Sequence, residues 1–464
     1  MLLDFTFSNF KCFVTDQQFT MCRPKADRDL QPEGWSIDGV STVAGVFGGN
    51  ASGKSSFLEA LLSLSCIVSR SVRDAERSPG FSREYFLLDQ EYENKPTDFF
   101  IDFIGIDNNR YQYQLSFNDV SVLYESLRVF KSRRSSVLYE RELSSDDQTY
   151  LYKYGTGFAG ARKTFEKMVR KDVTYLSVLH DMQHETTESA FQTLSNQIRG
   201  YQGWAFDNEI PTVIDLLDKG DKAGLALASI MTQTNLGLLS MELENETSRF
   251  LKKMSTPGQP AHESLKALIG EFLADTSPDL NPDEMQEILS NALASSPESV
   301  KTLVFAHHGK NGDVLFEKEL ESRGTLSSLA FFSMALRVLS SRTVCVVDEL
   351  DMSLHPRYVR ELVRLFRCPD TNPNQSQMIF SSHDVTLMSN LGFDQAGVLD
   401  RDQIWFTEKD LNTGEAELFP LTELSVRRKE NYMRNYLNGI YGALPDPQFH
   451  GAFANAIKAS KAME

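Results

Sequence analysis

The chain has 464 residues, of which 41% are hydrophobic and 24% charged, and its formal net charge is −17. This composition fits a globular protein with one large core or two smaller ones, and it excludes a disordered or collagen-like chain. The acidic surplus argues against a protein that coats DNA through a basic surface, and five cysteines with no C-x-x-C pair indicate reduced thiols in a cytoplasmic protein. The longest apolar runs, 57–68 and 326–339, are shorter than the about 20 residues of a membrane span, so we expect no contact with a membrane.

The first third of the chain is rich in strand patterns. Residues 1–24 alternate apolar and polar side chains, and a short β-rich run at 41–47 is followed by glycines and by a helical pattern from Lys54 to about Ser69. Further strand-like segments occupy 99–106, 111–117, 123–130 and 137–141, and the polar turn at 107–109 predicts a hairpin. We therefore predict a first α/β lobe at residues 1–155.

Helical patterns dominate the next part of the chain, and strands then return. Apolar residues recur at a spacing of three to four in 213–217, 225–231, 236–241, 265–273 and 285–293. After them we expect strands at 302–308, 314–319, 343–347, 378–381 and 403–407, with helices at 325–339 and 357–366. The order predicts an α/β fold, a mixed sheet with helices, that is split by a helical arm at 156–300 and completed by a second lobe at 301–464.

The segment 48–55 has the pattern G-x-x-x-x-G-K-S and lies between a predicted strand and a predicted helix. In this pattern backbone N–H groups surround phosphate oxygens, the lysine bridges the β- and γ-phosphates, and the serine hydroxyl ligates Mg²⁺. A glycine-rich turn that matches by accident is the alternative, which the strand–loop–helix context disfavours. The residues predicted to bind the nucleotide here are Gly48, Asn50, Ala51, Ser52, Gly53, Lys54, Ser55 and Ser56, with Ser55 also on the metal.

Two carboxylates, Asp348 and Glu349, end the apolar strand 343–347. In open α/β sheets ligands bind at the carboxyl ends of the strands, so this pair predicts Asp348 as a ligand of Mg²⁺ through water and Glu349 as the general base for an attacking water. A solvated turn after a buried strand is the alternative. His383 follows the strand 378–381 and is predicted to sense the γ-phosphate and polarise the same water, against the alternative of a surface histidine.

With these three motifs in this order, the sequence resembles the ABC-type ATPases of the SMC, RecF and OLD group. Within that group it is similar to the ATPases of bacterial abortive-infection and antiphage defence systems, the PARIS type first and the Septu type next. Besides the phosphate loop, the resemblance depends on Asn9-Phe10-Lys11, Glu321-Ser322-Arg323-Gly324-Thr325, the segment 348–356, and the C-terminal segments 399–406 and 436–445.

The resemblance implies the P-loop NTPase fold of the ABC type, with ATP and Mg²⁺ as cofactors. It implies that Lys11 approaches the nucleotide, and that Ser322 and Gly324 of one subunit cap the γ-phosphate held by Lys54 of another. The protein would then be a homo-oligomer of paired heads, and higher orders such as a hexamer are compatible with this. Two departures stand out: only a serine and a glycine remain of the signature Leu-Ser-Gly-Gly-Gln, and His355 replaces the usual D-loop aspartate. Gln90 is our candidate for the Q-loop.

The resemblance further implies a sensor ATPase of an antiphage, abortive-infection system that controls a separate effector. Fewer than 60 residues follow Phe406, without a D-x-D cluster, so we expect the nuclease, of Toprim or HNH type, to be another protein. A phage-encoded trigger is compatible with this hypothesis. The alternative is a RecF- or SMC-like repair ATPase that acts on DNA ends or junctions, and a non-hydrolysing scaffold is the third. The basic residues of 128–134 and 162–171 are either a solvated face or a docking surface for nucleic acid or an acidic phage protein.

Overall fold

The computed structural model describes residues 1–30, 32–131, 134–144, 149–201, 206–245, 301–389, 398–428, 430–445 and 449–461. The predicted helices at 265–273 and 285–293 lie outside the described residues. The chain divides into two compact units, the first formed by Met1–Gly203 with Arg337–Glu464 and the second by Trp204–Leu336. Each unit is described by itself.

A six-stranded sheet in the first unit has the order β16-β15-β3-β14-β13-β9. All neighbours in this sheet are parallel except β15 and β16, so the carboxyl ends of β3, β13 and β14 meet at one edge. The β3, β13, β14 and β15 strands were predicted from sequence, whereas β9 and β16 were not. The strands are β3 (Val43–Phe47), β9 (Ile198–Tyr201), β13 (Val344–Val347), β14 (Gln377–Ser381), β15 (Ile404–Lys409) and β16 (Ala416–Pro420).

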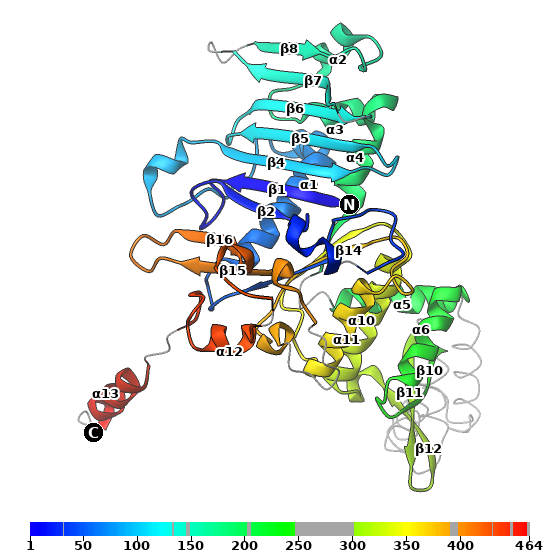
Figure 1. The fold of residues 1–464 in the computed structure, drawn as a ribbon. Coiled ribbons are helices and arrows are strands. Elements are labelled where there is room, and N and C mark those ends of the chain that lie inside the picture. The colour runs from blue at the N-terminus through cyan, green and yellow to red at the C-terminus, as the bar shows by residue number, and fades with distance from the viewer. Residues whose placement is uncertain are drawn as a thin grey trace, which may run out of the picture. The chain divides into compact units, whose positions relative to one another are not determined.

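A seven-stranded antiparallel sheet, in the order β2-β1-β4-β5-β6-β7-β8, forms the other part of this unit. Figure 1 shows these strands stacked as one sheet with α3 and α4 alongside. The side chain of Gln377 on β14 joins the two sheets, because it accepts from the N–H of Leu2 at 2.6 Å and donates to the carbonyl of Leu2 at 2.8 Å. The strands are β1 (Leu2–Ser8), β2 (Gln17–Thr20), β4 (Thr97–Ile104), β5 (Arg110–Phe117), β6 (Val122–Phe130), β7 (Ser136–Leu143) and β8 (Tyr150–Tyr154).

Helix α1 (Lys54–Arg77) fills the core of the first unit. Its residues Phe57, Leu61 and Leu64 are fully buried in one cluster with side chains of both sheets, such as Phe99 and Ile379. Of the described helices, α1 alone is long and apolar enough to cross a membrane by length and composition. A core helix passes the same test, and the buried face of α1 identifies it as one.

Helices α2 (Arg162–Met168), α3 (Tyr175–Asp181) and α4 (Glu185–Asn196) also belong to the first unit. Buried residues of α3 and α4, among them Leu176 and Leu194, share the core of α1. The sequence assigned these helices to the inserted arm, but the second compact unit begins at Trp204 rather than at residue 156. The reason is that their apolar faces have a ready partner in α1. Helices α11 (Pro356–Arg367), α12 (Tyr432–Leu437) and α13 (His450–Lys461) complete this unit.

The second unit contains α5 (Phe206–Asp218), α6 (Lys222–Gln233), most of α10 (Arg323–Leu339) and a three-stranded sheet. The sheet is antiparallel, in the order β10-β11-β12, with β10 at Leu238–Asn245, β11 at Lys301–Gly309 and β12 at Gly312–Glu317. The core of this unit includes Val213, Leu227, Phe305 and Leu329, from its helices and its sheet. The helix predicted at 236–241 is wrong, because these residues largely belong to β10, which pairs with β11 along its length.

Candidate nucleotide-binding site

The glycine-rich loop connects β3 to α1, as the sequence predicted. Gly48 has a φ of 151°, and a Cβ placed there would lie 2.4 Å from the backbone carbonyl of Thr407, so no other residue fits. Gly53 has a φ of 113° and packs against Phe13 and Cys12. Ala51 also has a positive φ, of 62°. The loop is therefore curled by backbone conformations that the neighbouring elements enforce.

The first turn of α1 is open to an anion. Gly53 precedes the helix and no side chain caps its first N–H groups, which leaves them free to bind phosphate oxygens. Ser55 and Asn50 are exposed, Ser56 is half-buried, and the Ser52 hydroxyl bonds the Thr407 hydroxyl at 2.6 Å. Hydroxyl and backbone donors at the start of a helix thus face the solvent where the motif requires a triphosphate.

Lys54 lies over this loop with a buried side chain. Its ammonium group donates to the carbonyls of Gly48 and Gly49, both at 2.9 Å. Burial lowers the pKa of Lys54, while the charges of Asp348, Glu349 and Asp351 oppose this shift. The three carboxylates therefore lie close enough for their field to act on the lysine.

The acidic pair sits at the same sheet edge as the loop. Val347 of β13 is paired with Phe380 of β14, and Ser381 of β14 is paired with Val46 of β3, so the residues that follow these strands are neighbours. Asp348 accepts a hydrogen bond from the Ser381 hydroxyl, and the N–H of Glu349 donates to the same hydroxyl oxygen at 2.8 Å. Glu349 has a φ of 54°, which is uncommon for a residue with a side chain and recurs at functional sites.

His383 follows the end of β14 and has an exposed side chain. Its backbone N–H donates to the Asp351 carboxylate at 3.1 Å. This hydrogen bond connects the turn after β13 to the turn after β14. His383 and Gly48 both line an open cavity of about 150 Å³, together with Tyr436, Leu444 and other residues of the C-terminal segment. The structure thus brings the phosphate loop, the acidic pair and the histidine together at one edge.

Lys11 is placed differently from the expectation that it approaches a nucleotide. Its ammonium group is paired with Glu59 of α1 and with Glu84, the latter at 3.2 Å. The turn that carries it does lie beside the loop, since Cys12 and Phe13 contact Gly53. A contact of Lys11 with nucleotide would require it to exchange these carboxylates for phosphate, so this role stays a prediction.

Ser322 and Gly324 belong to the second unit. The Ser322 hydroxyl accepts from the N–H of Thr325 at 3.1 Å, and the carbonyl of Gly324 accepts from the Ser328 hydroxyl at 2.8 Å. They therefore form the start of α10, as the sequence predicted for a loop ahead of a helix, and their part in a site with Lys54 stays a prediction. Gln90 is an exposed residue at the start of the 3-10 turn Gln90–Glu93.

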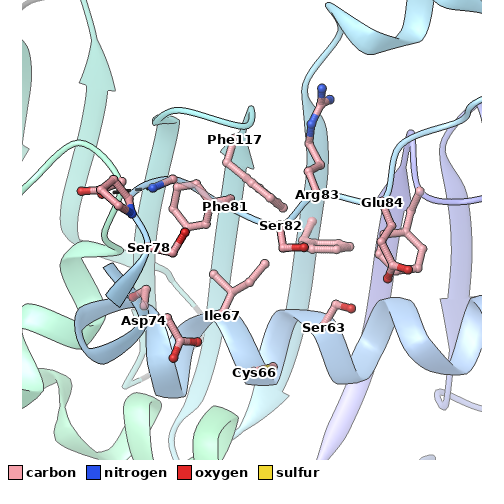
Figure 2. Close-up of a pocket in the computed structure, with 16 residues that line it drawn as sticks. Ser63, Cys66, Ile67, Asp74, Ser78, Phe81, Ser82, Arg83, Glu84 and Phe117 are labelled. Atoms are coloured by element: carbon pink, nitrogen blue, oxygen red, sulfur yellow. Dashed lines mark hydrogen bonds between the residues drawn. The ribbon is translucent and has the colours of Figure 1, made fainter. Parts of the chain in front are cut away.

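A second cavity, of about 370 Å³, lies elsewhere in the first unit (Figure 2). It is bounded by Ser63, Cys66 and Ile67 of α1 and by the segment that contains Phe81 and Arg83. Arg83 is held by Asp119 at 3.0 Å and by the carbonyl of Glu93 at 2.5 Å. None of the phosphate-loop residues or of the acidic pair is among its described lining residues, so we do not assign the nucleotide to it.

Sequence reasoning missed three contributors to the site. Ser381 holds the acidic pair, Thr407 bonds Ser52 and excludes a side chain at position 48, and Pro445 packs against Gly49. The two serines before His383 were a signal, because polar residues are unexpected at the end of a fully buried strand. Thr407 and Pro445 had no such signal, because their roles depend on tertiary packing.

The donor set at this edge fits Mg²⁺ and ATP. The uncapped N–H groups at the start of α1 are donors for phosphate, Lys54 supplies a cation, and Ser55 and Asp348 offer the oxygen ligands that Mg²⁺ prefers when phosphates complete its coordination. Glu349 follows Asp348 at the end of the same strand, β13, and His383 lies beyond the end of the neighbouring strand, β14.

Solved structures with a similar trace share little sequence with this chain. One is the SMC head bound to the C-winged helix domain of ScpA, with 12% identity over 90% of this chain and 96% of that chain and a TM-score of 0.42. Another is the SMC head domain from Thermotoga maritima, with 11% identity over 90% of this chain and 98% of that chain and a TM-score of 0.37. The recombination mediator protein RecF with ATPrS has 11% identity over 90% of this chain and 98% of that chain, and a TM-score of 0.33. Likenesses of this size carry no information on the substrate or partners of this chain.

No curated protein matches the sequence. Residues 43–389, well over half of the chain, match the model of a family described as "AAA domain, putative AbiEii toxin, Type IV TA system". This span runs from the first residue of β3 through the acidic pair to beyond His383. The chain therefore belongs to this family of AAA-domain ATPases, and its fold is the mixed α/β P-loop fold that the sequence predicted.

Proposed function

We propose that the protein is an ABC-type, Mg²⁺-dependent ATPase that serves as the sensor subunit of an antiphage, abortive-infection system. The observation that carries the ATPase part is the placement of Lys54, Asp348 and Glu349 at one edge of the parallel sheet, within reach of each other's charge. Membership in the AAA-domain family supports the same conclusion.

Bound Mg²⁺·ATP supplies the phosphoryl group whose transfer to water the site would accelerate. Lys54 and the free N–H groups at the start of α1 hold phosphate oxygens, and Ser55 and Asp348 orient the metal. Glu349 accepts a proton from the attacking water through its carboxylate, and the His383 imidazole holds that water by a hydrogen bond. Gly48 and Gly53 allow the positive-φ backbone that curls the loop where it packs against Thr407 and Phe13.

Two measurements test this part of the proposal, the binding of ATP and the release of phosphate from it. Lys54→Ala should lower the affinity for ATP by about 10- to 100-fold, because it removes a charge-assisted contact. Lys95→Ala is the matched control, since Lys95 is a half-exposed lysine away from the loop, paired with Glu91 at 2.7 Å. Wild-type protein that releases no phosphate at millimolar ATP and Mg²⁺, or an unchanged affinity in Lys54→Ala, contradicts the proposal.

The defence role rests on the family and on sequence. The matched family is described by a toxin and a toxin–antitoxin system, which supports an abortive-infection context. The short inserted arm supports the PARIS type over the Septu type, and the resemblance to these systems supports a separate nuclease effector. Purification together with the products of neighbouring genes, followed by mass measurement, should give a stable complex, and a monomer without partner contradicts this role.

The repair ATPase of RecF or SMC type is the second candidate. It is favoured by the basic residues on and after α2, of which Arg162, Lys163 and Lys167 are exposed. DNA ends or junctions should then raise the rate of ATP hydrolysis. The sensor proposal expects no such stimulation, and charge reversal at Lys163 and Lys167 separates a DNA contact from a solvated face.

A further inference from the structure

Ser381 is the last residue of β14 and is fully buried. Its hydroxyl donates to Oδ1 of Asp348 and accepts from the N–H of Glu349 at 2.8 Å. Its carbonyl accepts from the N–H of Leu350 at 3.0 Å. One serine therefore binds three consecutive residues, two of which are the acidic pair.

The single proton of a serine hydroxyl decides how this contact acts. A hydroxyl has one donor and two acceptor positions, and here the donor is directed at Asp348 while a lone pair receives the Glu349 N–H. Asp348 is thus held through one oxygen, and its other oxygen stays available. Because both contacts share one oxygen atom of Ser381, the carboxylate of Asp348 and the backbone of Glu349 are fixed relative to each other.

The backbone of Glu349 needs such a support. Its φ of 54° lies in the left-handed region, which a residue with a side chain occupies only where the surroundings enforce it. The Ser381 hydroxyl and carbonyl hold the N–H groups on both sides of the Glu349 Cα, namely those of Glu349 and Leu350. Without the hydroxyl, one of these two restraints is lost.

We propose that Ser381 is a positioning residue, which orients the Asp348 carboxylate and locks the Glu349 backbone so that both face the phosphate loop. The inference rests on the proposed ATPase function and names a group that this function needs but that touches neither nucleotide nor metal. Groups that orient metal-binding carboxylates commonly change metal affinity or activity by about 10- to 100-fold when they are removed.

Ser382 offers a matched control next in the chain. It is as buried as Ser381, but its hydroxyl accepts from the N–H of Asp384 at 2.9 Å and not from the acidic pair. Ser382→Ala therefore removes a buried hydroxyl at the end of the same strand without freeing Asp348 or Glu349. Ser381→Thr keeps a hydroxyl at position 381 and serves as the rescue variant.

Hydrogen exchange on the full chain without nucleotide tests the restraint itself. In Ser381→Ala the amide of Glu349 should exchange about fivefold faster, because its hydrogen bond to the Ser381 hydroxyl is lost, whereas Ser382→Ala and Ser381→Thr should match the wild type. The amide of Leu350, bonded to the Ser381 carbonyl, is an internal reference that each variant keeps. Unchanged exchange in Ser381→Ala overturns the positioning role, whatever the protein does with ATP. A melting curve for each variant identifies global unfolding, and Ser381→Cys replaces any variant that fails to fold.

Binding of a non-hydrolysable ATP analogue, with Mg²⁺ and with EDTA, tests the consequence for the metal. Ser381→Ala should bind the analogue in EDTA like the wild type, lose about tenfold in the affinity gained with Mg²⁺, and lower kcat more than it changes KM. An equal loss in EDTA and Mg²⁺ overturns the inference while the ATPase proposal stands. No binding by the wild type overturns the proposed function, and faster exchange in Ser381→Ala then still supports the restraint.

Discussion

Glu349 is the residue on which the proposed hydrolysis depends most. It follows β13, has a positive φ and is fixed through its N–H by Ser381. Because a carboxamide keeps the shape of the side chain but cannot accept the proton, Glu349→Gln should slow hydrolysis by about 100-fold or more while it keeps ATP bound. Single-turnover phosphate release and analogue binding measure the two effects separately.

Glu361→Gln is the control for this variant, because Glu361 is an exposed glutamate on α11 that pairs with Arg364 at 2.5 Å. Hydrolysis in Glu349→Gln that equals that of Glu361→Gln would refute the assignment of Glu349 as the base.

Residue identities at the site could be predicted from sequence where the motif is contiguous. Lys54 and Ser55 follow from one local pattern, and Asp348 and Glu349 from a strand that ends in charge. The partner of Asp348 could not be predicted, because Ser381 is 33 residues away and meets it only through the register of β13 and β14. The same limit applies to Lys11, whose partners Glu59 and Glu84 come from separate segments.

A buried ionic network connects the antiparallel sheet to α3. Glu125 on β6 accepts from the hydroxyls of Tyr113 at 3.0 Å and Tyr139 at 2.8 Å and from the N–H of Tyr175 at 2.6 Å, and it faces Arg141 at 3.5 Å. Burial, together with the charge of Glu125, raises the pKa of Tyr113 and of Tyr139, so their hydroxyls stay protonated and donate to Glu125. The network fixes the start of α3 on the sheet.

Glu125→Ala should lower the free energy of unfolding by about 3–5 kcal/mol, because it leaves Arg141 buried without its carboxylate. Urea denaturation measures the change. Glu142→Ala, an exposed position on the neighbouring strand β7, should stay within about 0.5 kcal/mol of the wild type. Equal effects of the two substitutions would show that the network does not stabilise the fold.

Asp402, in the 3-10 turn Arg401–Gln403, predicts a pH dependence of stability. Burial raises its pKa from 3.8 to about 6, although Arg23 pairs with it at 3.1 Å. The folded state therefore binds a proton that the unfolded state has released between pH 4 and 6, so stability should fall as the pH rises through this window, by at most about 3 kcal/mol. Urea denaturation of Asp402→Asn should show a flatter dependence than the wild type from pH 4 to 6, and an equal slope would contradict the assignment.

Elements with a strong period could be predicted, and those that exist through pairing could not. The strands β4 to β7 and the helix that begins at Lys54 follow from their patterns, although the helix was expected to end at about Ser69 and extends to Arg77. In contrast, Ile198–Tyr201 contains an arginine and a glycine and becomes the strand β9 only because it pairs in parallel with β13. The segment at 238–245 was read as helical up to residue 241, since a short apolar run does not distinguish a helix from a strand until its partner β11 is known.

At the scale of the whole molecule, the resemblance to ABC-type heads implies that two chains share each nucleotide. Lys54 belongs to the first compact unit, whereas Ser322 and Gly324 belong to the second. A helix that starts next to Ser322 directs the positive end of its dipole toward that residue's surroundings, as a γ-phosphate cap needs. The boundaries of the two units could not be predicted, because α3 and α4 share the apolar patterns of an arm and reveal their partner only in the packed core.

ATP should therefore pair chains when hydrolysis is blocked. Glu349→Gln with ATP and Mg²⁺ should show by light scattering a mass of at least twice the 52.4 kDa of the chain, because the bound nucleotide is not consumed. Ser322→Arg in the same background should prevent this pairing, since the long arginine side chain fills the space in which Ser322 would meet the γ-phosphate. Ser229→Arg, at an exposed serine of α6 in the same unit, should not prevent it. Melting curves exclude loss of the α10 cap as the cause. A mass that does not change with ATP, or that changes equally in both arginine variants, would mean that the serine at the start of α10 does not complete a shared site.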